Sequence, residues 1–176
     1  MRLSVSAFNP FRCVLLGSIA LVMVGCSTTR LVEKKQHKEV YDALGLVEGR
    51  RDNFALYTEA ASWLHVPHLD GGSSRTGTDC SFLVYSIYKT VYNKTLERNS
   101  AAMLHKNCRR ISRCRLREGD LVFFNTFGSS KSNITHVGIY LKNNKFVHTS
   151  TQKGVNVSDL DEAYYLKAWV CGGRVK

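Results

Sequence analysis

Several features that this 176-residue chain lacks, or has little of, exclude some classes of protein. It has two prolines, which argues against a long proline-rich linker, and its length suits one domain with a substantial core. The apolar run at residues 13–24 extends for about a dozen residues, whereas a membrane-spanning helix needs about 20. The six cysteines form no C-x-x-C pair and no cysteine–histidine cluster with zinc-ligand spacing. We therefore expect no membrane-spanning helix, no metal and no cofactor.

Acidic residues are also scarce, with 14 against 25 basic residues and a formal net charge of +11. A basic surface favours an anionic partner, which could be nucleic acid, a membrane or a charged polymer. Six of the basic residues lie in the segment 106–117. We interpret this segment as a solvent-exposed face, with polyanion binding as the alternative.

The first 26 residues have the pattern of an export signal. Arg2 and Arg12 flank a short n-region, and the apolar run has the length of a signal-peptide h-region. Residues 21–26 resemble a bacterial lipobox, in which the cysteine, here Cys26, is lipidated (for example with palmitate) and becomes the new N-terminus. An ordinary signal peptide or a short anchor is the alternative. Export makes an envelope polymer, rather than nucleic acid, the expected partner.

This signal divides the chain into three segments. We predict a lipoprotein signal peptide at residues 1–25, a lipidated N-terminus and polar tether at 26–51, and a catalytic domain at 52–176. By resemblance to bacterial sorting rules, Ser27 favours the outer membrane, with the protein facing the periplasm. An exported protein meets an oxidising environment, in which Cys108 and Cys114 could form a disulfide; the sequence does not decide whether they pair.

The stretch at residues 71–92 has the features of a nucleophile region. A glycine-punctuated loop leads to a cap-type residue, Thr78 or Asp79, and an amphipathic helical run follows. Cys80 then lies in the first helical turn, where unpaired N–H groups and the helix dipole favour a thiolate and lower the thiol pKa. The alternative is a cysteine that only fills core space.

Helical patterns come first along the chain and strand patterns later. Residues 52–64 predict a helix with Asp52 as its N-cap, ended by Pro67. Short strands are expected at residues 121–124, 136–141, 145–149, 155–157 and 169–175. The order predicts an α+β fold with N-terminal helices and a largely antiparallel sheet of about five strands.

The hairpin at residues 136–149 decides whether two histidines can meet. A two-residue turn would place His136 and His148 on opposite faces. A three-residue loop at 142–144 would place Gly138 opposite His148 and both histidines on one face, with the apolar residues on the other. We prefer this register. His136 would then be the base for Cys80, and His148 would orient it.

These motifs, in this order, resemble the NlpC family of bacterial cell-wall cysteine peptidases. They read VPH at 66–68, GG at 71–72, GTDCS at 77–81, REGDLVFF at 117–124, HVGIY at 136–140, NNKFVH at 143–148 and GV at 154–155. The resemblance covers roughly residues 52–175. It implies a papain-like fold, with the nucleophile at a helix N-terminus packed on the sheet. It also implies hydrolysis of peptidoglycan stem peptides at a D-glutamyl–diaminopimelate or D-alanyl–diaminopimelate bond.

The resemblance implies roles for the neighbours of Cys80 as well. His68, Asp79 and Ser81 are expected to serve the oxyanion hole or the substrate, together with the backbone N–H of Cys80. The family commonly has a tyrosine where His68 stands and a glycine where Phe82 stands. Acyl transfer or amidase chemistry on the same thiolate, and a non-enzymatic wall-binding lipoprotein, are the alternatives. We expect a monomer.

Overall fold

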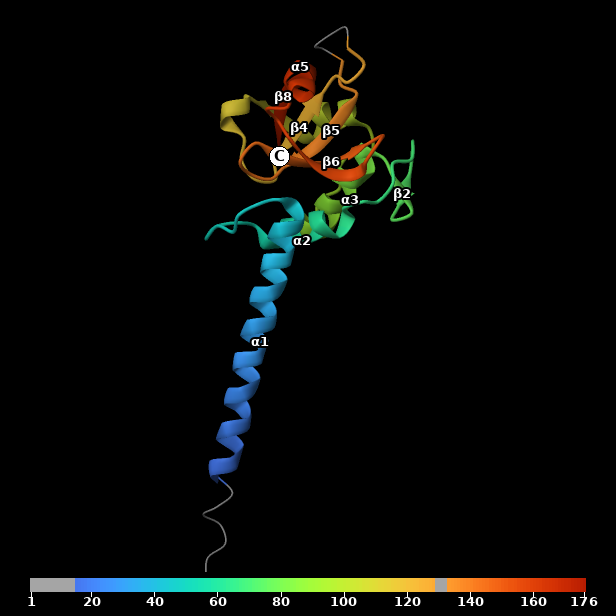
Figure 1. Ribbon diagram of the computed structural model, residues 1–176. Helices are drawn as coiled ribbons and strands as arrows, with labels where there is room; N and C mark the ends of the chain where they lie inside the picture. The colour runs from blue at the N-terminus through green and yellow to red at the C-terminus, as the bar shows by residue number, and fades with distance from the viewer. Residues whose placement is uncertain (1–14, 129–132) are drawn as a thin grey trace, which may run out of the picture. The chain divides into compact units, whose positions relative to one another are not determined.

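The computed structural model describes residues 15–128 and 133–176 (Figure 1). The chain divides into two compact units, Met1–Glu39 and Val40–Lys176. All the nucleophile and hairpin motifs lie in the second unit. Residues 1–14 of the predicted signal peptide lie outside the described residues.

The first described helix, α1, extends over Leu15–Leu44 and includes the backbone of Cys26. It extends through more than half of the segment predicted to be a polar tether, because residues 30–44 contain neither glycine nor proline and are rich in straight-chain residues with high helix propensity. It ends where Gly45 adopts a φ of +63°. None of the helices in the described part of the chain is both long and apolar enough to span a membrane.

The second unit starts earlier than the predicted boundary at residue 52. Tyr41, Leu44 and Leu46 are each less than a tenth exposed and belong to the main hydrophobic core of this unit. Asp52 does not cap the next helix, which corrects the sequence-based prediction. Its carboxylate instead accepts a hydrogen bond from Tyr41 Oη at 2.9 Å and pairs with Lys142. Asn53 is the N-cap, and its side chain accepts from the backbone N–H of Leu56 at 3.1 Å.

In the second unit, most of the helices precede most of the strands along the chain, as the sequence predicted. In chain order they are α2 (Phe54–Trp63), β1 (Ser73–Ser74), β2 (Gly77–Thr78), α3 (Cys80–Tyr92), α4 (Ser100–Ala102), the π-helical turn η2 (Met103–Asn107), β3 (Cys108–Ile111), the 3₁₀ turn η3 (Arg113–Arg115), β4 (Leu121–Phe124), β5 (His136–Tyr140), β6 (Lys145–Ser150), β7 (Gly154–Asp159), α5 (Ala163–Ala168) and β8 (Trp169–Val175).

The main sheet has six strands in the order β3-β8-β4-β5-β6-β7, and every neighbouring pair is antiparallel. The extra strand, β3, falls in the basic segment 106–117, where Arg109 and Arg110 are exposed. Figure 1 shows α2 and α3 on one side of the sheet and α5 on the other. The apolar run of β4 is buried on both faces, because Leu121 and Phe123 join the α2–α3 core while Val122 and Phe124 pack toward α5. The α+β prediction is confirmed.

The β5–β6 hairpin has the three-residue loop that the side-chain pattern predicted. Ile139 is opposite Val147, and the backbone N–H of Leu141 donates to the carbonyl of Lys145 at 2.9 Å. Asn143 and Asn144 both adopt left-handed conformations, with φ of 52° and 60°. This register brings His136 and His148 to one face.

Gly138 makes that face possible. A Cβ atom at Gly138 would lie 2.8 Å from the Phe146 ring, 2.8 Å from the carbonyl oxygen of Val147 and 3.1 Å from Cβ of His148. Two of these three contacts are shorter than real Cβ contacts, and one is with fixed backbone. Glycine at this position therefore leaves room for the Phe146 ring and for the backbone and Cβ of β6.

Candidate active site

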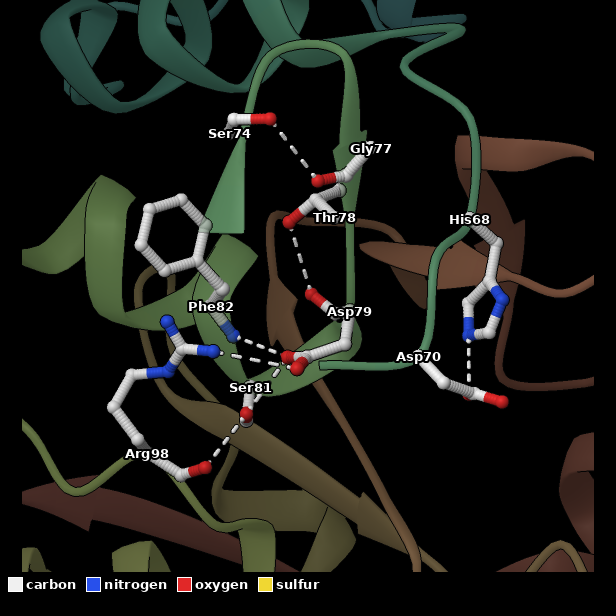
Figure 2. A network of polar contacts seen from close by, with 9 residues as sticks. All are labelled: His68, Asp70, Ser74, Gly77, Thr78, Asp79, Ser81, Phe82 and Arg98. Carbon is white, nitrogen blue, oxygen red and sulfur yellow. Dashed lines mark hydrogen bonds and ion pairs between the residues drawn. The ribbon is translucent and has the colours of Figure 1, made fainter. Parts of the chain in front are cut away.

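The start of α3 is held by a network of polar contacts centred on Asp79 (Figure 2). Asp79 is the N-cap, as predicted, and its Oδ1 accepts hydrogen bonds from the backbone N–H of Phe82 at 2.7 Å and from Ser81 Oγ at 2.8 Å. Its other oxygen pairs with Arg98 at 3.3 Å, and Ser81 Oγ also lies 2.9 Å from the carbonyl oxygen of Arg98. These contacts fix the backbone on both sides of Cys80.

Ser81 and Asp79 therefore have structural partners in the described part of the chain. Ser81 is 6% exposed, so its hydroxyl is enclosed with those partners. The sequence predicts that both residues serve the oxyanion hole or the substrate, and direct contact with substrate stays a prediction. The partner that the sequence did not reveal is Arg98, which lies beyond the end of α3 in no recognisable motif.

The β1–β2 hairpin that precedes Cys80 is fastened to α2. The Arg75 guanidinium lies 3.6 Å above the Trp63 ring centroid, donates to the carbonyl oxygen of Ser62 at 2.7 Å and pairs with Glu59 at 2.9 Å. Trp63 Nε1 donates to the same Glu59 carboxylate at 2.8 Å. These bonds position the loop from which α3 starts.

Phe82 is part of an aromatic stack. Its ring centroid lies 6.0 Å from those of Trp63 and Tyr85, and the Arg98 guanidinium lies 4.4 Å above it. In Figure 2, the Phe82 ring and His68 flank the Thr78–Asp79 segment on opposite sides. Phe82 therefore contributes to the packing that supports the loop.

The side chain of Cys80 is partly buried where α3 packs on β5. Burial raises the pKa of the Cys80 thiol, and the Asp79 carboxylate raises it further. Hydrogen bonds from the backbone N–H groups of Val137 and Ser81 act in the opposite direction. The net shift is upward, so the lowering expected from a helix start is outweighed by desolvation. The contact with Val137 places the thiol beside the residue that follows His136.

The two predicted histidines form a direct pair. His136 Nε2 lies 3.0 Å from His148 Nδ1, with the ring planes nearly perpendicular at 87°. Burial, with a smaller contribution from His68, lowers the pKa of His136 to about 4. Burial likewise lowers the pKa of His148, which is 1% exposed. Both imidazoles are therefore neutral at neutral pH, as a general base and its orienting partner must be.

His68 lies on the loop before β1, beside the segment that leads to Cys80. It forms an isolated parallel bridge with Thr78, and its Nε2 is 3.5 Å from Asp70 Oδ1 (Figure 2). Cys80 therefore contacts the backbone of β5 next to His136, His136 pairs with His148, and His68 is bridged to Thr78, two residues before Cys80.

The other cysteines of the second unit lie apart from this group. Cys108 and Cys171 are buried, Cys114 is exposed, and all are free thiols, as is Cys80. The pairing of Cys108 with Cys114 that the sequence left open is therefore not formed. Burial raises the pKa of Cys108 to about 12, which makes it a poor nucleophile.

The helices packed on a mostly antiparallel sheet define a class, the α+β proteins of papain-like architecture. Comparison with known proteins gives the family, because the NlpC/P60 family model matches residues 65–174. The chain is 34% identical to the probable endopeptidase NlpC of Escherichia coli K12 over 148 residues, 84% of this chain and 89% of that protein. The chain belongs to the NlpC/P60 family.

Two further comparisons agree. The chain is 30% identical to the murein DD-endopeptidase MepS/murein LD-carboxypeptidase of Escherichia coli K12 over 172 residues, 90% of this chain and 88% of that protein. A crystal structure from Staphylococcus aureus, of a protein similar to lipoprotein in the NLP/P60 family, superposes with a TM-score of 0.62 at 27% identity. That match covers 74% of this chain and 45% of the other, so this chain spans less than half the length of that relative.

Acid should destabilise the fold between about pH 6.5 and pH 4, because His136 has its ordinary pKa of 6.5 when unfolded and about 4 when folded. In this window the unfolded chain binds more protons than the folded one, so the free energy of unfolding falls as the pH falls. At about 1.4 kcal/mol per pKa unit, His136 accounts for up to about 3 kcal/mol. Urea unfolding at about pH 7 and about pH 4.5 measures the loss.

The matched variants are His136→Gln and His105→Gln, since His105 is an exposed histidine outside the site. The His105→Gln protein should retain the full acid loss, and the His136→Gln protein should lose part of it. Equal acid losses in the two variants would show that His136 is not the group responsible.

Proposed function

We propose that this protein is a cysteine peptidase that hydrolyses a peptide bond in peptidoglycan. The observation that carries the proposal is the 3.0 Å contact between His136 and His148 on the strands beside Cys80. A nucleophile, a base and a group that orients the base are what covalent acyl chemistry requires. Membership of the NlpC/P60 family supports the same conclusion, because the Escherichia coli relatives are named endopeptidases and one of them is named for murein.

The reaction begins when Cys80 Sγ attacks the carbonyl carbon of the scissile bond and His136 takes the thiol proton. The raised pKa of Cys80 and the lowered pKa of His136 favour the neutral pair at rest. We therefore expect the proton to move as the carbon–sulfur bond forms. The backbone N–H of Cys80 and an N–H of His68 would stabilise the oxyanion.

The second half of the reaction uses the same groups. His136 gives its proton to the leaving amine, and a thioester remains on Cys80. Water then attacks the thioester while His136 accepts its proton. The acid product leaves, and the proton returns to the thiol. His148 holds the His136 ring in place through both steps.

The proposed location is the inner face of the outer membrane, through lipid attached to Cys26. The support is the signal-like sequence at residues 1–25 and the lipobox resemblance at residues 21–26. Under this proposal residues 26–39 form the connection to the membrane, since the second unit starts at Val40. An anchor of this kind would hold the protein where peptidoglycan is within reach, and we propose that it acts there as a monomer.

Digestion of purified sacculi tests the function, with mass spectrometry of the muropeptides that are released. We expect peptides cleaved with the gain of one water per bond, at the D-glutamyl–diaminopimelate or the D-alanyl–diaminopimelate linkage. Products joined to an amine instead of water would indicate acyl transfer. Binding to sacculi with no released peptide would indicate a wall-binding protein. Either result would overturn the peptidase proposal.

A further inference from the structure

We propose that Asn156 and Ser158 are positioning residues that determine which nitrogen of His148, and therefore of His136, carries the proton. The inference rests on the proposed function, because it gives His136 the form that a base for Cys80 requires. It follows from a chain of hydrogen bonds that starts at the backbone carbonyl of Gly154 and ends at the His136 ring. Each donor and acceptor along this chain is fixed by the previous one.

The chain starts at a group that can only accept. Asn156 Nδ2 lies 2.9 Å from the carbonyl oxygen of Gly154. A carbonyl oxygen only accepts, so the Nδ2 group donates this hydrogen bond. This fixes the orientation of the amide and turns Asn156 Oδ1 toward Ser158 Oγ, 3.3 Å away. Since Oδ1 can only accept, the Ser158 hydroxyl donates its one proton to Asn156.

Ser158 then has only lone pairs to offer to His148. The distance from Ser158 Oγ to His148 Nε2 is 3.1 Å, so Nε2 carries the proton and donates it. A neutral imidazole has one N–H, and His148 Nδ1 is consequently an acceptor. His136 Nε2, 3.0 Å away, must donate to it. The remaining nitrogen of His136, Nδ1, therefore keeps a free lone pair.

Sheet geometry explains why these groups align. Asn156 is directly opposite His148 in the β6–β7 pairing, and Ser158 lies two residues further along β7. Residues two apart on a strand project from the same face. His148, Asn156 and Ser158 therefore share one face of the sheet, together with His136 from β5.

Tyr165 on α5 also contacts the His148 ring. Its hydroxyl lies 3.1 Å from His148 Nε2, and its ring packs at 4.9 Å from Phe146 and 5.3 Å from Phe124. A tyrosine hydroxyl can donate as well as accept, so Tyr165 alone does not select a tautomer. Ser158, whose proton is engaged by Asn156, makes the selection. Tyr165 supplies the packing that leaves His148 1% exposed.

Nitrogen-15 NMR of the imidazole rings tests the chain directly, because nitrogens with and without a proton have well-separated shifts. In the wild-type protein at neutral pH, we expect His136 and His148 to be protonated on Nε2 alone. The measurement needs no substrate and no activity. It can therefore fail while the peptidase proposal stands, or succeed if the protein does not cleave peptidoglycan.

Variants test the assignment of the two positioning residues. In Ser158→Ala, the Tyr165 hydroxyl loses its hydrogen bond with Ser158 and can donate to His148 Nε2, so we expect His148 to change to the Nδ1-protonated form. Asn156→Ala, which frees the Ser158 hydroxyl, should give a mixture of the two forms. Ser158→Thr keeps the hydroxyl and should restore the wild-type spectrum. Tyr164→Phe, at an exposed tyrosine beside Tyr165, is the control that should change nothing.

The chemical readout is the rate at which iodoacetamide alkylates Cys80. We expect Ser158→Ala to slow it about tenfold and to lower kcat without raising KM, as for loss of an interaction with the base rather than with substrate. A wild-type His148 protonated on Nδ1 would overturn the proposal. So would Ser158→Ala and Asn156→Ala proteins that fold, judged by circular dichroism, and keep the wild-type tautomers.

Discussion

Replacing Cys80 with alanine should abolish the release of muropeptides from sacculi, lowering the rate by at least about a thousandfold. The proposed thioester needs a nucleophile, and no other cysteine described in the second unit can substitute. Cys108 and Cys171 are buried, and Cys114 is an exposed residue of η3 that lies 3.3 Å from Ser112. Mass spectrometry of the released peptides over time measures the rate.

The matched control is Cys114→Ala, which removes a free thiol outside the site and should leave the rate unchanged. Cys80→Ser adds a second comparison, because a serine hydroxyl is close in size to the thiol but is far less ionised near neutral pH. It should fold like the wild type and be almost inactive. Release of the same peptides by Cys80→Ala at a comparable rate would rule out a cysteine mechanism.

The part of the site that the sequence predicted depends on local rules. A cap residue followed by an amphipathic run located the start of α3, because Asp79 satisfies first-turn N–H groups wherever the helix lies. The hairpin register followed from the alternation of side chains, because a shift of one residue would have exposed the core residues Val137 and Val147. Local chemistry was sufficient in both cases.

What the sequence did not reveal depends on contacts between distant segments. Arg98 reaches Asp79 across 19 residues, and Tyr165 reaches His148 across 17. Neither has a pattern that indicates its partner. The pKa of Cys80 was missed for a similar reason, since the helix start is visible in the sequence but the burial against β5 is not. Asp52 has the sequence position of a cap, but one of its partners, Lys142, lies 90 residues away and is not visible in the local sequence.

Replacing His136 with alanine should cost about a hundredfold to ten-thousandfold in the rate of peptide release, the usual contribution of a general base. It should also nearly abolish alkylation of Cys80 by iodoacetamide at neutral pH. Burial already raises the pKa of this thiol, so without a base very little thiolate forms. His148→Ala should weaken both readouts less, because His148 acts through His136.

Cys114 provides an internal reference for the alkylation, because it is exposed and does not belong to the proposed catalytic group. Peptide mapping of the labelled protein measures the labelling of both cysteines in one sample. A variant that merely unfolds would expose Cys80, Cys108 and Cys171, and all three would be labelled faster. A folded His136→Ala protein should instead lose the Cys80 label and retain that of Cys114. Unchanged labelling of Cys80 in both His136→Ala and His148→Ala would remove the chemical basis for the histidine pair, and the thiol would then need a different base. His68, which contributes to the lowered pKa of His136, would be the first residue to test.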